Sequence, residues 1–80
     1  MRQINTNKTY KHFKGNYYKV LYIAYDGEKD DENGNPIPLV IYQSSHDGKL
    51  WVRTYDNFAE KVDKEKYPNT TQVYRFEEVD

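Results

Sequence analysis

The sequence predicts a mainly β domain, a small antiparallel barrel or roll of four to five strands with one short helix. Short runs of β-branched and aromatic residues recur along the chain, and turn signals that contain Gly, Pro, Asn or Asp separate them. The 80 residues include 9 Tyr, 3 Phe and 1 Trp, whose rings can fill a small core. We expect one domain over residues 10–80, preceded by a flexible arm over the polar, non-periodic residues 1–9.

The clearest predicted strand runs from Asn16 to Tyr25, after a turn at Lys14-Gly15-Asn16. Strict alternation places Leu21 and Ile23 on one side and Val20 and Tyr22 on the other, so both sides carry apolar residues. That pattern favours a strand in a barrel over a one-sided sheet. The segment from Asp26 to Pro36 is predicted to be a loop, because Asp26-Gly27 begins it and Asn33-Gly34-Asn35-Pro36 ends it.

The second and third strands are predicted at Ile37–Ser44 and Leu50–Tyr55, joined by a turn at Asp47-Gly48. Alternation in the third strand places three side chains on one face: Trp51, Arg53 and Tyr55.

A short helix is expected next, with Asp56 as its N-cap and with Phe58 and Val62 one turn apart. Tyr67-Pro68-Asn69 ends that segment, and Thr71–Val79 forms the last predicted strand.

The composition excludes several classes of protein. The chain has no cysteine, so a disulfide scaffold or a cysteine-based zinc site is ruled out. No apolar run approaches the roughly 20 residues that span a bilayer, and the start lacks a signal-peptide core, so we expect no membrane association and a cytoplasmic location. The net charge of −1 disfavours duplex DNA as a partner. Self-association would bury more surface in so small a domain, and a homo-oligomer stays open.

Catalytic and metal-binding patterns are weak, and we expect a protein that is not an enzyme and has no cofactor. Ser45-His46-Asp47 contains the residue types of a catalytic triad, but three adjacent side chains cannot adopt its geometry. The five acids of the 26–35 segment lack the glycine and the final glutamate of a calcium loop. The two histidines, His12 and His46, have no metal-ligand spacing. The four glycines are isolated from one another, so the sequence contains no glycine-rich phosphate-binding loop.

The segments placed above resemble the DUF1653 family of small bacterial and phage domains of unknown function. The resemblance runs from about Tyr10 to Phe76. It lies in the opening Tyr10-Lys11-His12-Phe13-Lys14-Gly15-Asn16, followed by Tyr18, Val20, Val40, Tyr42, Trp51-Val52-Arg53, Phe58, Val62 and Arg75-Phe76. It implies an SH3-like β fold and a standalone cytoplasmic domain, and it implies no activity, substrate or cofactor.

The chain departs from the family pattern at three places, which marks it as a divergent member. The acidic segment from Asp26 to Asn35 replaces a short turn after the first strand. Thr54 stands where the family has Pro, and Asn57 stands where it has Met.

A binding module fits the residue inventory best. Rings on a strand face, planar guanidinium cations and a glycine turn are the groups that bind a nucleotide or a similar anionic aromatic molecule. Such capture predicts a pocket of about 300 Å³ or more with an arginine projecting into it. The candidate ligand-binding residues are Trp51, Arg53, Tyr55, Arg75, Lys14, His12 and Tyr42.

Other interpretations of the same residues stay open. Trp51 can be a core residue, and Arg53 and Arg75 can pair with nearby glutamates. Two other functions are a protein-interaction adaptor, which needs an open strand edge or a flat tyrosine-rich face, and single-stranded nucleic-acid binding, which needs a positive groove. A nucleotide-binding domain that acts by sequestration would suit a phage protein.

Overall fold

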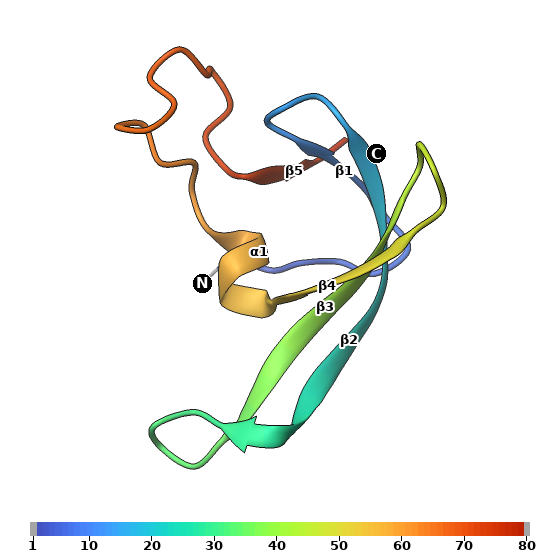
Figure 1. Cartoon of the computed structure of the whole chain (residues 1–80), viewed down its shortest axis with the longest axis vertical. Coiled ribbons are helices and arrows are strands. Elements are labelled where there is room, and N and C mark those ends of the chain that lie inside the picture. Colours follow the sequence, from blue (N-terminus) through green and yellow to red (C-terminus); the bar gives the residue numbers. More distant parts are fainter. Residues whose placement is uncertain (1, 80) are drawn as a thin grey trace.

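The computed structural model describes residues 2–79 and contains one antiparallel sheet and one short helix (Figure 1). The sheet has five strands in the order β4-β3-β2-β1-β5. The elements are β1 (Thr9–His12), β2 (Tyr17–Asp30), β3 (Pro36–Ser44), β4 (Leu50–Thr54), α1 (Tyr55–Ala59) and β5 (Phe76–Glu78). The predicted fold class, mainly β with one short helix, is confirmed. The sheet is open rather than a closed barrel, with β4 and β5 at its two edges.

The β2–β3 hairpin is longer than predicted. Strand β2 continues to Asp30 and β3 begins at Pro36, so most of the predicted acidic loop belongs to an irregular extension of the hairpin. The register shifts between Tyr25 and Asp30, and the remaining turn is tied together by Asp31, whose carboxylate accepts N–H groups from Asn33 and Asn35. The hairpin tip extends away from the rest of the domain (Figure 1).

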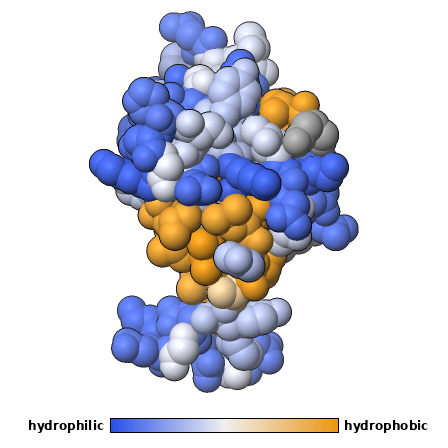
Figure 2. All heavy atoms as spheres, turned by 90° about the vertical axis from the view of Figure 1, so that its right-hand side faces the viewer, coloured by the Kyte–Doolittle hydropathy of each residue, from blue (hydrophilic) through white to orange (hydrophobic). Residues whose placement is uncertain are grey.

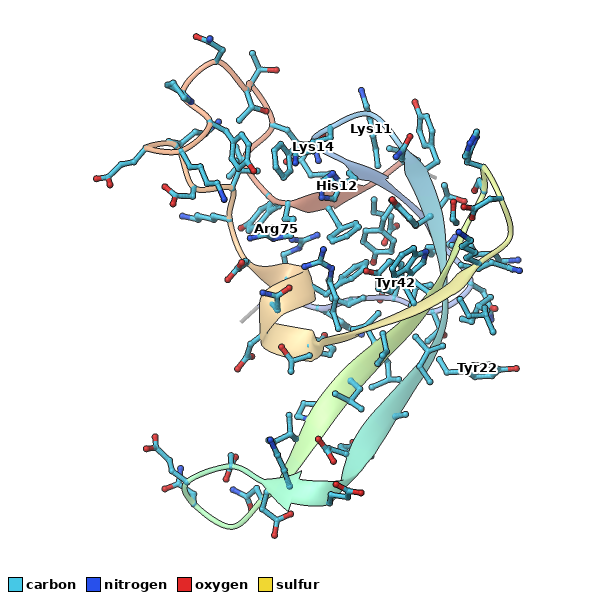
Figure 3. The ribbon with its side chains drawn as sticks, in the orientation of Figure 1. Lys11, His12, Lys14, Tyr22, Tyr42 and Arg75 are labelled. Carbon is cyan, nitrogen blue, oxygen red and sulfur yellow. The ribbon has the colours of Figure 1, made fainter. Side chains whose placement is uncertain are left out.

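A β-bulge near Leu21 corrects the alternation that we predicted for β2. Val20 pairs with Tyr42, but the next pairs are Tyr22 with Ile41 and Ile23 with Val40. The extra residue moves Ile23 to the same face as Val20 and turns Tyr22 outward. Tyr22 is consequently exposed and points away from the core (Figure 3).

The core lies on the concave face of the sheet, where α1 packs against aromatic rings from several strands. Phe58 of α1 stacks on Phe76 with ring centroids 4.1 Å apart and an interplanar angle of 7°. Tyr10 and Tyr42 meet the Phe58 ring edge-on at 5.5 and 5.2 Å. Edge-to-face and offset ring pairs add to the area that they bury, so these rings supply much of the packing in a small domain.

Residues 2–8, where we expected an arm, lie against the domain. Ile4 is only 4% exposed and belongs to the core cluster. The Asn7 N–H donates to the Val20 carbonyl at 2.7 Å, and the Val20 N–H donates to Lys8 at 3.1 Å. Arg2 donates to the carbonyls of Ala59 and Phe76.

The helix and the last strand differ from the prediction in their ends. Thr54, not Asp56, caps α1: its hydroxyl accepts the Asn57 N–H at 3.2 Å. Val62 lies beyond the helix, in a segment that hydrogen-bonds to the residues before β5, with an isolated bridge between Lys61 and Tyr74. Strand β5 is therefore shorter than predicted and begins at Phe76.

Candidate ligand-binding site

Arg53 projects from β4 onto the concave face, where neutral groups hold its guanidinium. Its Nε donates to the Tyr42 hydroxyl at 2.8 Å, and one terminal nitrogen donates to Asn57 Oδ1 at 2.6 Å. Its guanidinium carbon lies 5.5 Å from the centroid of the Phe76 ring. No carboxylate among residues 2–79 forms an ion pair with Arg53, so its charge stays uncompensated locally.

Arg75 lies immediately before β5 and is paired. Its backbone N–H donates to the Glu60 carbonyl at 3.0 Å, and its guanidinium forms an ion pair with the Glu60 carboxylate. Its Nε is buried and has no hydrogen-bond partner among the described residues. The predicted pairing of Arg75 with a glutamate is thus present.

His12 joins the two arginines to the β1–β2 turn. Its ring stacks on Phe13 with centroids 4.5 Å apart and meets Phe76 edge-on at 4.8 Å. Its Nδ1 accepts the Lys14 N–H at 3.1 Å. Burial, helped by the charges of Arg53, Arg75 and Lys14, lowers the pKa of His12 from 6.5 to about 4, so the ring is neutral at pH 7.

Four of the seven predicted site residues therefore come together around Phe76. They come from four different places in the fold: His12 from β1, Tyr42 from β3, Arg53 from β4 and Arg75 from the segment before β5. Figure 3 shows His12, Tyr42 and Arg75 on the concave face. Lys14 lies next to them at the β1–β2 turn.

The other two predicted residues lie elsewhere. Trp51 shares the face of Arg53, as predicted, but it lies at the free edge of the sheet and is 49% exposed. Tyr55 begins α1 instead of continuing β4, and its hydroxyl accepts the Ile4 N–H at 2.6 Å. Tyr55 therefore anchors the N-terminal segment, and the predicted three-residue strand face is wrong at this position.

A cavity of about 340 Å³ lies between the β1–β2 turn and the loop before β5. Phe13 and Tyr67 form its aromatic wall, with ring centroids 4.8 Å apart. The ammonium groups of Lys14 and Lys66 lie 5.2 and 5.5 Å from the Tyr67 centroid. Pro68, Asn69 and Thr70 complete the lining.

The electrostatics of this cavity favour an anion. The ion pairs of residues 2–79 include neither Lys14 nor Lys66, so both ammonium groups lack a carboxylate partner. The Lys14 ammonium, with a contribution from Lys66, holds the pKa of the Tyr67 hydroxyl below its ordinary value. The cavity thus combines two aromatic rings with two available cations.

The family model described as a protein of unknown function, DUF1653, matches residues 8–78, from the start of β1 to the end of β5. The chain belongs to the DUF1653 family. No curated protein and no solved structure matches it.

The opening motif of this DUF1653 domain supplies one side of the cavity. His12, Phe13 and Lys14 are consecutive, and the turn after them is closed by the Gly15 N–H, which donates to the His12 carbonyl at 2.8 Å. Gly15 has a φ of 108°, a conformation that side chains rarely adopt. The turn therefore holds Phe13 and Lys14 in place against residues 66–70 of the loop before β5.

A second cavity, of about 320 Å³, lies under the N-terminal segment of the DUF1653 domain. Ile23, Tyr25, Pro38 and Tyr55 line it together with Arg2. The Arg2 guanidinium is already bonded to two carbonyls and lies 4.1 Å from the Tyr74 ring. Fewer of its N–H groups are therefore available to an anion that enters this cavity. Both cavities have the predicted volume, but neither is lined by Arg53 or Arg75.

Sequence reasoning missed Phe13, Lys66 and Tyr67 as site residues. Phe13 was visible in the family motif and Tyr67 in the Tyr67-Pro68-Asn69 segment, but nothing local shows that the two rings meet. Within residues 2–79, no three His, Cys, Asp or Glu side chains are grouped as metal ligands would be. No helix in that range is long and apolar enough to cross a membrane.

Proposed function

We propose that this DUF1653 domain is a non-catalytic binding module that captures a small anionic aromatic ligand, a nucleotide or a nucleotide-derived signal. We infer that it works in the cytoplasm by sequestration, as would suit a phage counter-defence protein. The observation that carries the proposal is the cavity in which Phe13 and Tyr67 face Lys14 and Lys66.

The chemistry of the cavity supports this ligand class. A base can stack on the Tyr67 or Phe13 ring, and each such contact is worth about 1–3 kcal/mol. The Lys14 and Lys66 ammonium groups can then bind phosphate oxygens as point charges. The volume of about 340 Å³ lies within the usual range of small-molecule pockets.

The neighbouring arginine cluster extends the positive potential beyond the cavity. His12 stacks on Phe13 and feels the charges of Lys14, Arg53 and Arg75. These groups form one cationic and aromatic surface from β4 to the β1–β2 turn. A ligand with more than one phosphate could contact Lys14 in the cavity and still lie close to Arg75.

The test is a thermal-shift screen with nucleoside mono-, di- and triphosphates and cyclic nucleotides. We expect stabilisation by at least one of them, and the double variant Lys14→Gln/Lys66→Gln should lose it. Lys19→Gln, an exposed lysine on β2 outside the cavity, is the matched control and should keep it. Absence of stabilisation by every nucleotide would overturn the proposal.

Tyr67 separates stacking from charge. Tyr67→Phe keeps the ring and should bind the best nucleotide nearly as well as the unchanged protein. Tyr67→Leu removes the ring, and we expect the dissociation constant to rise about 5- to 150-fold, which corresponds to the stacking energy above. If Arg53→Ala abolishes binding and Tyr67→Leu does not, the ligand lies on the Arg53–Arg75 surface and the cavity assignment is wrong.

A second candidate function, protein–protein interaction, is favoured by one observation. Strand β4 is an edge of the sheet, and three of its five residues are large, exposed apolar side chains. An exposed edge of this kind can accept another strand.

A further inference from the structure

Strand β4 pairs on one side only. Its five residues, Leu50–Thr54, pair with Leu39–Gln43 of β3, and β4 ends the strand order. Edge strands of stable monomers usually carry a proline, a bulge or an outward lysine that prevents further pairing. The register of β4 is continuous, the strand contains no proline, and its one charged residue, Arg53, faces the core side.

The outer face next to this edge is apolar. Leu50 and Val52 are 63% and 58% exposed, and Ile41, which pairs with Val52 on that face, is partly buried. Figure 2 shows apolar side chains gathered on one side of the molecule between two hydrophilic regions. On the opposite face Trp51 is half exposed beside Arg53, which has no carboxylate partner among residues 2–79.

The hydrogen-bond phase of β4 determines which backbone groups are free. The Ser44 N–H donates to the Lys49 carbonyl at 2.9 Å, so Ser44 and Lys49 are a hydrogen-bonded pair. Hydrogen-bonded and non-hydrogen-bonded pairs alternate along an antiparallel ladder. Trp51 and Arg53 therefore bond to β3, and the backbone groups of Leu50 and Val52 point away from the sheet, as does the Thr54 N–H, whereas the Thr54 carbonyl belongs to the N-cap of α1.

We propose that a second copy of this chain pairs with this edge, β4 against β4 and antiparallel, about a two-fold axis that passes through Val52. In this register Val52 faces Val52 of the second copy, and Leu50 faces Thr54. Leu50 and Val52 have free backbone groups and Thr54 keeps a free N–H, so the two edges match in phase. A two-fold axis uses the same surface on both copies and closes the assembly at a dimer.

Side-chain chemistry selects the same register. Trp51 of each copy lies directly across from Arg53 of the other, on the same face, at a spacing that lets cross-strand pairs interact. The Arg53 guanidinium stays bonded to Tyr42 and Asn57, so the Trp51 ring of the other copy packs on the apolar stem of Arg53. The dimer forms this contact twice and covers the exposed Trp51 ring, while Leu50 and Val52 of both copies extend one apolar face.

Cysteine cross-linking tests the register, because the chain contains no cysteine and an introduced thiol is unique. In a hydrogen-bonded pair the Cα atoms lie about 5.5 Å apart, within the range of a disulfide. Val52→Cys should therefore give a covalent dimer under mild oxidation. Leu50→Cys is the matched control: it is equally exposed on the same face, but in this register two copies of Leu50 lie about 13 Å apart along the strands.

The oligomeric state gives the second measurement. Sedimentation equilibrium should show a dimer for the unchanged chain. Val52→Lys, which sets two like charges face to face, should weaken dimerisation at least about tenfold. Val73→Lys makes the same change at a 48% exposed valine outside the interface and should leave the dimer intact. A monomer at all concentrations, or cross-linking at Leu50→Cys as fast as at Val52→Cys, would overturn the proposal.

Discussion

His12 is the residue of the cationic cluster whose pKa is shifted far from its ordinary value. The ring is partly buried between Phe13 and Phe76, and three positive side chains act on it, from β4, from the segment before β5 and from the β1–β2 turn. A proton on this imidazole would add a fourth positive charge. The neutral ring instead accepts the Lys14 N–H and helps to shape the turn that carries Phe13.

The lowered pKa of His12 predicts how stability depends on pH. The unfolded chain binds a proton at pKa 6.5 and the folded chain only at about 4, so the unfolded state holds more protons between these values. The free energy of unfolding should therefore fall as the pH decreases from 6.5 to 4. We expect a decrease of about 1–2 kcal/mol, which is less than the full pKa difference implies, because solvent screens part of the repulsion at a partly exposed ring. Urea unfolding at several pH values measures it.

His12→Asn is the comparison for that prediction. Asparagine can accept the Lys14 N–H but does not titrate, so the pH dependence between 6.5 and 4 should flatten. The exposed carboxyls of Asp26 and Asp47 also have lowered pKa values. Because these values lie below the ordinary 3.8, protonation of the two carboxyls in the folded chain affects stability at lower pH than His12 does. An unchanged slope in His12→Asn would show that other groups cause the effect.

At the scale of the elements, the segment over residues 2–8 has a structural role that its sequence pattern does not indicate. It is polar and without period, yet it supplies Ile4 to the core and accepts or donates backbone hydrogen bonds with Val20. The Asn5 N–H also donates to the buried Tyr10 hydroxyl at 2.8 Å. The segment thus completes the packing around β1 and β2.

Shortening the Ile4 side chain should therefore lower the free energy of unfolding as much as shortening a core side chain of a strand does. Ile4→Ala removes a 4% exposed side chain, and we expect a loss of about 2–5 kcal/mol of unfolding free energy. Ile4→Val should lose about 0.5–1.5 kcal/mol and stays measurable if the alanine variant does not fold. Gln3→Ala, at the exposed neighbouring position, should change little. Chemical denaturation compares the three, and equal stability of all of them would mean that the segment does not contribute.

Local signals predicted the elements that depend on local chemistry. The Asp47-Gly48 turn and the alternation on either side of it led to β3 and β4 within one residue of their observed ends. The errors are at positions that tertiary contacts decide: the Leu21 bulge, the burial of Ile4 and the bridge between Lys61 and Tyr74. The helix N-cap is Thr54 rather than the predicted Asp56, because β4 ends one residue earlier than predicted and α1 begins at Tyr55.

The candidate site follows the same division. The family motif and the strand pattern pointed to His12, Tyr42, Arg53 and Arg75, and the curvature of the sheet brings them together around Phe76. The cavity itself depends on a contact between Phe13 and Tyr67, which are far apart in the chain. Strand alternation predicts Trp51 in the site because it shares a face with Arg53, but the edge position of β4 leaves the Trp51 ring half exposed to solvent.

At the scale of the whole molecule, charge is separated along the longest axis. Residues 1–24 include Arg2 and four lysines and no acid, whereas residues 26–35 include five acids and one lysine. The β1–β2 turn lies near one end of the molecule and the acidic β2–β3 tip at the other (Figure 1), over an extent of 38 Å. A small anion that enters the cavity stays far from the acidic tip, but a polyanion that follows the long axis would be repelled by it.

This charge separation predicts weak salt dependence and no gain from ligand length. For single strands, the logarithm of affinity falls with the logarithm of salt concentration by about 0.7 for each phosphate neutralised, so the two lysines of the cavity correspond to a slope of about −1.4. A mononucleotide and a single-stranded oligonucleotide with the same terminal base should bind within about threefold of each other. The first phosphate beyond the cavity meets Arg75, which is already paired with Glu60, and phosphates that follow the long axis approach the acidic β2–β3 tip. Fluorescence titrations over a range of salt concentrations measure both quantities. A slope several times steeper, with affinity that rises with strand length, would instead assign the cationic surface to single-stranded nucleic acid, with Arg53 and Arg75 as further phosphate contacts.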